Sequence, residues 1–130
     1  MTEKRVLNPA ALPQPSGYSH VVEAQAGRTL YISGQIALDA AGQLVGAGDV
    51  AAQAEQVFAN LAAALEAAGA SFAHVVKLTY FLTDIAQIAA VRTVRDRYIN
   101  TEQPPASSAV EVRRLVRGDL LIEIEAIAIV

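Results

Sequence analysis

The chain has no cysteine and only two histidines, and these scarcities exclude several kinds of chemistry. A chain without cysteine forms no disulfide, offers no thiol nucleophile and builds no cysteine-ligated metal site. His20 and His74 fall in different kinds of predicted element and are too few for a convincing zinc site. We therefore expect no metal site. The absence of cysteine is also compatible with the cytoplasmic location that we predict.

The chain also lacks a block of like charges and a long apolar run. Its formal net charge is −3, whereas nucleic-acid binding usually requires a basic face. No uninterrupted apolar segment reaches the roughly 18 residues of a membrane span. The first residues, Met1 to Val6, lack the apolar centre of a signal peptide. Neither nucleic acid nor a membrane is an expected partner.

Aromatic residues are scarce at 5%, although 53% of the chain is hydrophobic. Much of the hydrophobic fraction is alanine, which buries little area per residue. Because apolar burial contributes roughly 25 cal/mol per Å2, this composition favours an additional interface between subunits. The length of 130 residues is typical of one domain, and we expect a single domain over residues 1–130.

Hydrophobic periodicity and turn residues divide the chain into five strands and two helices. Residues 1–17 are rich in proline and predict an extended, irregular arm. Asp49 and Asp84 are the expected caps of the two helices. The predicted strands are 20–24, 30–36, 75–82, 107–115 and 120–130, and the predicted helices are 50–68 and 84–98. The order ββαβαββ predicts an α+β fold, with a mixed β-sheet and two helices packed on one of its faces.

Several short segments, taken in their order and spacing, resemble the RidA/YjgF family of imine and enamine deaminases. They are Ser16-Gly17-Tyr18-Ser19, Ile32-Ser33-Gly34-Gln35-Ile36, the strand from Val76 to Asp84, Pro104 to Val112, and Leu120 to Ala128. The resemblance extends from about residue 8 to residue 129. It implies a chorismate-mutase-like, YjgF-like fold and a homotrimer. It also implies that a small molecule binds in clefts between neighbouring subunits, without a cofactor or metal.

The resemblance further implies roles for individual residues. Glu123 matches the glutamate that holds or activates the attacking water, and Tyr18 matches a tyrosine that lines the cleft, so these two are the predicted catalytic residues. The predicted substrate-binding residues are Ser33, Gln35, Arg92, Ser107 and Ala109.

Ser107 departs from the family's pattern, because members with deaminase activity carry an arginine after Pro-Ala. Arginine offers a substrate carboxylate two parallel charged donors, each worth about 1.5–3 kcal/mol, whereas serine offers one neutral donor. This difference is expected to weaken carboxylate anchoring at least about tenfold. Ala109 stands where a Cys, Ser or Thr is frequent in the family.

Two arginines on the second predicted helix, Arg92 and Arg95, are candidates to replace the missing cation. Arg92 occupies a position where the family often has a small polar residue, near the mouth of the cleft. The alternative is that Arg92 pairs with Asp96, four residues later, on a solvated helix face. Both interpretations remain open on the sequence alone.

Two functions are compatible with these residues. The first is a hydrolase of the 2-iminobutanoate/2-iminopropanoate deaminase type that acts on a non-standard imine or enamine. The second is a non-catalytic trimer whose clefts bind a small metabolite. RNA cleavage, which has been attributed to some relatives, is disfavoured by the acidic balance and by the scarcity of histidine.

Overall fold

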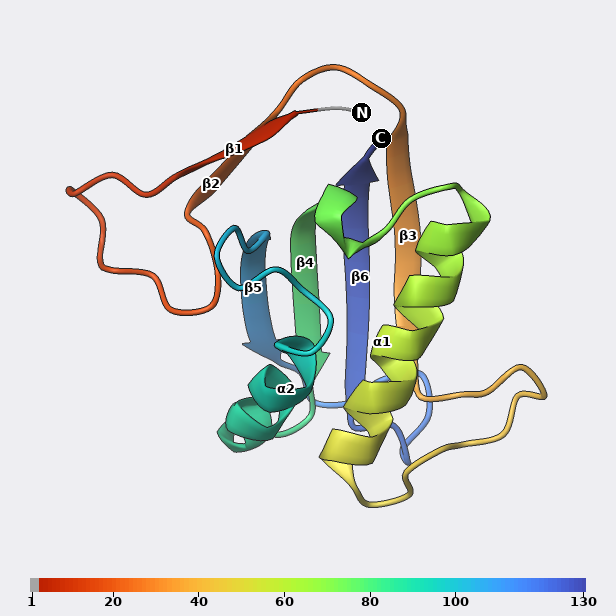
Figure 1. Ribbon diagram of the computed structural model, residues 1–130. Helices are drawn as coiled ribbons and strands as arrows, with labels where there is room; N and C mark the ends of the chain where they lie inside the picture. The colour runs from red at the N-terminus through yellow and green to blue at the C-terminus, as the bar shows by residue number, and fades with distance from the viewer. Residues whose placement is uncertain (1–2) are drawn as a thin grey trace.

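A computed structural model describes residues 3–130 and contains six strands, two α-helices and two short 3-10 helices (Figure 1). In chain order these are β1 (Lys4–Leu7), β2 (Val21–Ala24), β3 (Thr29–Ile36), α1 (Val50–Ala67), η1 (Phe72–His74), β4 (Val75–Leu82), η2 (Ile85–Gln87), α2 (Ile88–Arg95), β5 (Ala106–Glu111) and β6 (Ile122–Ile129).

The main sheet has four strands in the order β3-β6-β4-β5. Strand β6 runs antiparallel to both β3 and β4, whereas β4 and β5 are parallel. Both α-helices lie on the same face of this sheet, and β1 and β2 form a separate antiparallel ribbon at its side (Figure 1). The predicted α+β architecture, a mixed sheet with helices on one face, is therefore confirmed. No helix within residues 3–130 has the length and apolar composition needed to cross a membrane.

The core lies between the two helices and the sheet. Strand β6 shows how the sequence specifies it, because Ile122 and Ile124 are fully buried beneath the helices, while Glu123 between them points to the uncovered face. Helix α1 contributes the predicted apolar stripe, in which Val57 and Leu61 are fully buried. The two faces of the sheet thus have different environments, one dry and one open.

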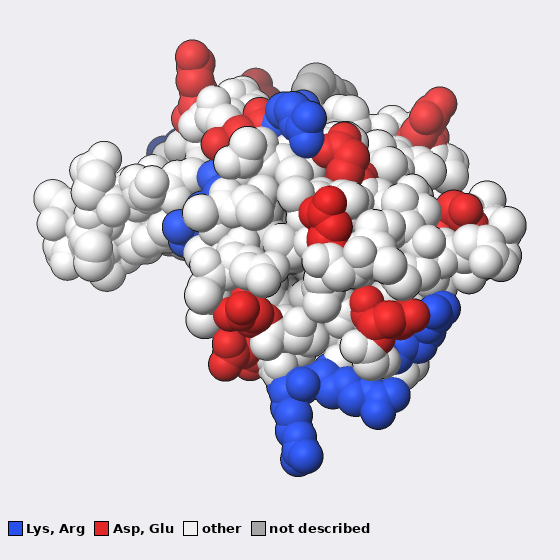
Figure 2. Space-filling model, turned by 90° about the horizontal axis from the view of Figure 1, so that it is seen from below, with Lys and Arg blue, Asp and Glu red and all other residues white. Residues whose placement is uncertain are grey.

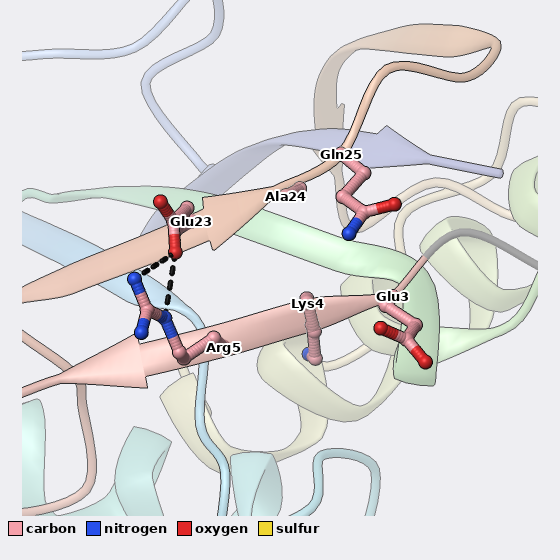
Figure 3. Close-up of a pocket in the computed structure, with 6 residues that line it drawn as sticks. All are labelled: Glu3, Lys4, Arg5, Glu23, Ala24 and Gln25. Atoms are coloured by element: carbon pink, nitrogen blue, oxygen red, sulfur yellow. Dashed lines mark hydrogen bonds and ion pairs between the residues drawn. The ribbon is translucent and has the colours of Figure 1, made fainter.

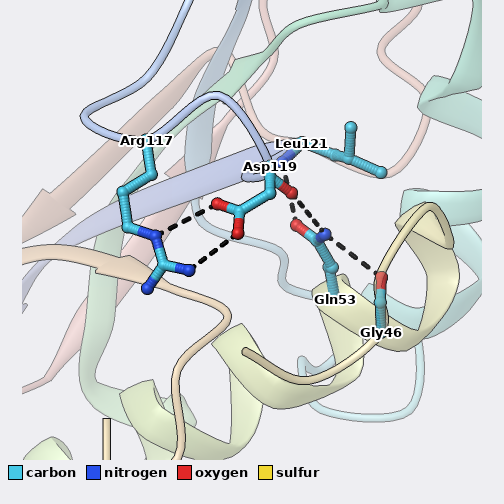
Figure 4. A network of polar contacts seen from close by, with 5 residues as sticks. All are labelled: Gly46, Gln53, Arg117, Asp119 and Leu121. Atoms are coloured by element: carbon cyan, nitrogen blue, oxygen red, sulfur yellow. Dashed lines mark hydrogen bonds and ion pairs between the residues drawn. The ribbon is translucent and has the colours of Figure 1, made fainter. Parts of the chain in front are cut away.

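The side chain of Gln53, on α1, is a polar group in this core and it joins three segments (Figure 4). Its amide nitrogen donates to the carbonyls of Gly46 and Asp119 at 3.1 and 3.0 Å, and its amide oxygen accepts from the Leu121 N–H at 2.8 Å. Arg117 in turn pairs with the Asp119 carboxylate. Gln53 therefore fixes the turn that leads into β6, which carries Glu123.

The N-terminal arm differs from the prediction. Residues 4–7 were expected to be irregular, but they form β1 and pair with β2, with Lys4 opposite Ala24 and Leu7 opposite Val21. The prediction was wrong because a four-residue strand has too short a pattern to be seen in sequence, and its partner lies well along the chain.

The second half of the chain also contains shorter elements than predicted. Asp84 does act as a cap, but of η2, and α2 covers only Ile88–Arg95 instead of continuing to residue 98. The last turn tightens, since the Tyr98 N–H bonds to the Arg95 carbonyl three residues back. Strand β5 ends at Glu111, opposite Leu82, because its partner β4 ends there.

Candidate functional site

A cavity of about 250 Å3 lies between α2 and strands β4 and β5. Its polar lining residues are Ser16, Tyr18, Tyr80, Arg92, Arg95, Ser107 and Ser108, and its apolar ones are Ile88, Val91 and Ala109. Four of the predicted site residues, Tyr18, Arg92, Ser107 and Ala109, therefore lie together.

The strand register explains why Ser107 and Ala109 face this cavity. They lie opposite Leu78 and Tyr80 of β4, whose side chains are buried on the helix-covered face. Residues paired across neighbouring strands share a face of the sheet, so both point toward α2. The Ser107 hydroxyl makes only a long contact, 3.5 Å, with the Pro105 carbonyl within residues 3–130. It is thus available to a ligand.

Tyr18 reaches the cavity because the segment that carries it is fastened to the start of β5. Ser19 is almost fully buried and donates its hydroxyl to the Pro104 carbonyl at 2.5 Å. The Ser19 N–H also bonds to the Pro105 carbonyl at 3.2 Å. Two of the motifs that resemble the family, far apart in sequence, are therefore hydrogen-bonded neighbours.

Arg95 projects from α2 into the same region and is only 8% exposed. Its guanidinium pairs with Asp96, at 2.8 Å from Nη2 and 2.9 Å from Nε. Gly17 has a left-handed φ of 75°, and a Cβ there would lie 2.2 Å from Arg95 Nη2. Gly17 is therefore required both by its own conformation and by the guanidinium beside it.

The Arg92–Asp96 pair considered in the sequence is not formed, because Asp96 is occupied by Arg95. Arg92 remains exposed at the mouth of the cavity. The two arginines thus differ in role: Arg95 is fixed and buried, whereas Arg92 is solvated.

Tyr80 contributes a polar group that the sequence did not indicate. Its hydroxyl is buried beside the Arg95 guanidinium and donates to no acceptor within residues 3–130. Burial raises the pKa of Tyr80 well above its ordinary value, and the positive charge of Arg95 acts in the opposite direction. The hydroxyl stays protonated at neutral pH and can donate a hydrogen bond. In sequence, Tyr80 resembles any aromatic residue of a buried strand.

The second part of the candidate site is the carboxylate of Glu123 on the uncovered face of the sheet. A Cβ on Gly34 of β3 would lie 2.0 Å from Glu123 Oε2. The Ser-Gly-Gln segment thus leaves room for a carboxylate that lies directly over the Gly34 backbone. This close approach explains why the central residue of the motif is glycine.

Ser33 and Gln35 do not line the cavity that holds Ser107. The register between β3 and β6 shifts between Ile32 and Gln35, so Gln35 lies opposite Ile124 and beside Asn60 of α1. A bulge inserts an extra residue here, so Ser33 and Gln35 do not share a face of β3. The Gln35 amide donates to the Ser33 carbonyl at 3.1 Å.

Within a single chain, the predicted site residues therefore lie in two separate groups. Tyr18, Arg92, Ser107 and Ala109 lie on the helix-covered side, whereas Glu123 lies on the uncovered side. Within residues 3–130, no three His, Asp or Glu side chains gather as metal ligands.

A larger hollow of about 390 Å3 lies at the β1–β2 ribbon (Figure 3). Arg5 and Glu23 form an exposed ion pair at this hollow, and Lys4 donates to the Val75 carbonyl at 3.2 Å. The two acidic and two basic side chains that line it balance in charge, and it contains none of the predicted site residues. The smaller cavity under α2 is therefore the candidate functional site.

Comparison with known proteins agrees with these features. The family model described as Endoribonuclease L-PSP matches residues 9–130. Protein DfrA of Myxococcus xanthus is 44% identical over 129 residues, which cover 99% of this chain and 97% of that protein. The human 2-iminobutanoate/2-iminopropanoate deaminase is 42% identical over 128 residues, which cover 97% of this chain and 90% of the human protein.

A comparison of three-dimensional structures points to the same family. The crystal structure of YyfB from Yersinia pestis, described as a protein of unknown function of the conserved Rid protein family, matches with a TM-score of 0.89 at 42% identity and covers 98% of both chains. The resemblance seen in the short motifs thus extends to the whole chain and to its three-dimensional structure. This protein belongs to the RidA/YjgF family.

Proposed function

We propose that this protein hydrolyses a small imine or enamine to a carbonyl compound and ammonia, at sites between the subunits of a cytoplasmic homotrimer. One observation carries the proposal: the chain holds two complementary half-sites, a cavity lined with donors under α2 and a carboxylate seated over Gly34. Similarity to a protein named for imine deamination supports the same reaction class.

Assembly is part of the proposal because one chain keeps the two half-sites apart. A site that contains both Ser107 and Glu123 requires the cavity of one copy to meet the uncovered sheet face of another. That face exposes apolar side chains, including Tyr31 at 80% and Val110 at 42%. Exposed apolar residues on an otherwise ordered sheet are typical of an interface between subunits.

In the proposed reaction, a water molecule attacks the carbon of the C=N bond while Glu123 accepts one of the water protons. Glu123 returns this proton to the nitrogen, which completes a carbinolamine. The proton of the carbinolamine hydroxyl then moves to the nitrogen, the C–N bond breaks, and a C=O bond forms as ammonia leaves. Tyr18 packs against the substrate, and Ser107 donates a hydrogen bond to it. Water and imine are thereby converted to carbonyl compound and ammonia, without a redox step.

The test is ammonia release from imines generated freshly by an amino-acid oxidase, over a panel of side chains. We expect at least one imine to be hydrolysed faster than in buffer, and Glu123→Gln to lower that rate about a hundredfold or more. Glu66→Gln is the matched control, because Glu66 is exposed on α1, away from the cavity and from the uncovered sheet face. No acceleration across the panel would refute the proposed reaction.

A second substitution tests the role of the residue that departs from the family. Ser107→Arg adds two charged donors to the cavity wall where the parent has one neutral hydroxyl. We expect this variant to hydrolyse 2-iminobutanoate at least about tenfold faster than the parent. Stabilisation of the parent by small metabolites without any ammonia release would instead support a non-catalytic, metabolite-binding trimer.

RNA cleavage is less well supported than imine hydrolysis. On the face seen in Figure 2, acidic side chains are interspersed with uncharged ones, and the basic side chains at one edge lie next to acidic ones. Proteins that bind single-stranded nucleic acid without sequence preference combine a basic groove with stacked aromatic residues. The cavity under α2 is closer in size to a small metabolite than to an RNA strand.

A further inference from the structure

The lining of the cavity under α2 has an unbalanced charge. Within the described residues, it contains two guanidinium groups, those of Arg92 and Arg95, and no carboxylate. Asp96 pairs with Arg95 from outside this lining and is half-exposed, so it neutralises part of one charge only. The cavity is therefore electrostatically suited to an anion.

Arg95 keeps donors beyond those that Asp96 accepts. Asp96 takes the Nε and Nη2 groups through a single oxygen, Oδ1, so that within residues 3–130 the Nη1 group bonds to no carboxylate or carbonyl oxygen. A guanidinium carries five N–H donors in a planar fork that matches a carboxylate. Because the side chain is only 8% exposed and its Nε and Nη2 groups are bound by Asp96, the fork is held in place before a ligand arrives.

Tyr80 supplies a second indication that a ligand belongs here. Its side chain is 4% exposed and lines the cavity beside the Arg95 guanidinium, and its hydroxyl donates to no acceptor within the described part of the chain. Buried hydroxyls are nearly always hydrogen-bonded, so an unpaired one in a cavity wall is expected to meet a ligand acceptor.

We propose that Arg95 and Tyr80 form an anion-binding end of this cavity, which holds the carboxylate of a short-chain aliphatic ligand. The alkyl part of the ligand lies against Ile88, Val91 and Ala109, which form the apolar part of the lining. The cation that is missing at position 107 on β5 is thus supplied from α2. This inference rests on the proposed function only in placing the carboxylate in the site where the imine reacts.

The inference is tested by binding of unreactive probes, measured by calorimetry or by NMR titration. Butanoate is the charged probe and butanamide is its neutral counterpart. We expect the parent to bind butanoate at least about tenfold more tightly than butanamide, and Arg95→Met to remove this preference. Arg97→Met is the matched control, since Arg97 follows two residues later and pairs with Glu55 at a different surface.

Tyr80→Phe keeps the inference testable if Arg95→Met fails to fold, because it removes one oxygen and leaves the ring in place. We expect butanoate binding to weaken about tenfold in this variant, with little change for butanamide. Equal binding of the two probes by the parent, or unchanged butanoate binding in Tyr80→Phe, would overturn the inference.

The outcome is separable from that of the ammonia assay. Butanoate binding that depends on Arg95, without turnover of any imine, would sustain the anion site and refute the hydrolase. Turnover of imines by a parent that does not prefer butanoate would sustain the hydrolase and refute the anion site.

Discussion

Tyr80→Phe distinguishes a cavity prepared for a ligand from a core that is merely well packed. The hydroxyl of Tyr80 is buried and donates to no acceptor within residues 3–130, whereas the ring packs against Phe58 with centroids 6.5 Å apart. The substitution removes the hydroxyl and keeps the ring contacts. Its effect on stability therefore shows whether the Tyr80 hydroxyl makes a hydrogen bond in the folded protein.

The magnitude follows from the cost of an unmade hydrogen bond. Leaving a buried polar group unsatisfied costs about 1–3 kcal/mol, and removing the group recovers part of that cost. We expect ligand-free Tyr80→Phe to be more stable than the parent by about 1 kcal/mol. For a chain of this length, that corresponds to a rise in Tm of about 3 °C.

The assay is urea unfolding followed by circular dichroism at one fixed protein concentration, because the stability of an oligomer depends on concentration. Tyr98→Phe is the matched control: the Tyr98 hydroxyl donates to Glu55 Oε1 at 2.7 Å, so its loss should lower stability by about 1 kcal/mol. The two substitutions make the same chemical change, and we expect them to change the free energy of unfolding in opposite directions.

A saturating concentration of butanoate should reverse the sign of the stability difference between Tyr80→Phe and the parent. The parent then gains the hydrogen bond that Tyr80→Phe cannot form, so the parent becomes the more stable of the two. If ligand-free Tyr80→Phe is instead destabilised by 1 kcal/mol or more, the hydroxyl already has a partner and the argument from an unpaired donor fails.

Three further substitutions test other parts of the structure. Gly34→Ala should displace the Glu123 carboxylate and lower imine hydrolysis at least about tenfold, whereas Gly118→Ala, with nothing within 4 Å of its new Cβ, should leave the rate unchanged in the same assay. Gln53→Leu removes three hydrogen bonds and should lower the free energy of unfolding by about 2–4 kcal/mol in urea. Asp49→Ala removes the cap of α1 and should cost about 1 kcal/mol by the same measurement; a loss below the error would show that the cap bond is not formed in solution.

Much of the fold could be predicted from local pattern. The strand Val75–Leu82 was predicted with the bounds that the structure has, because β-branched and aromatic residues dominate it. Asp49 before an apolar stripe located the start of α1 correctly. These features depend on residues close to one another in sequence, so a single chain reveals them.

The candidate site was less predictable because it depends on strand register. Resemblance pointed to Tyr18, Ser107 and Glu123 together, but no pattern within the sequence states which face of the sheet each will share. The parallel pairing of β5 with β4 turns Ser107 toward α2, and the antiparallel pairing of β6 turns Glu123 away from it. Tyr80 was missed for the same reason, because only the pairing with Ala109 shows that it borders a cavity.

The positions of Ser107 and Arg95 have to be considered together, since both side chains border one small cavity. An arginine on β5 would hold a carboxylate from the sheet side, next to Ala109. With the cation on α2, the carboxylate lies at the helix and beside the Ser16–Ser19 segment, which is fastened to Pro104 and Pro105. The other end of the ligand is then directed toward β5, where Ser107 offers a hydroxyl that lacks a strong partner within residues 3–130. Under the proposed anion site, the exchange at position 107 would reverse the orientation of the ligand in the cavity and keep its affinity for an anion. This predicts a different set of substrates from those of a protein with arginine at this position.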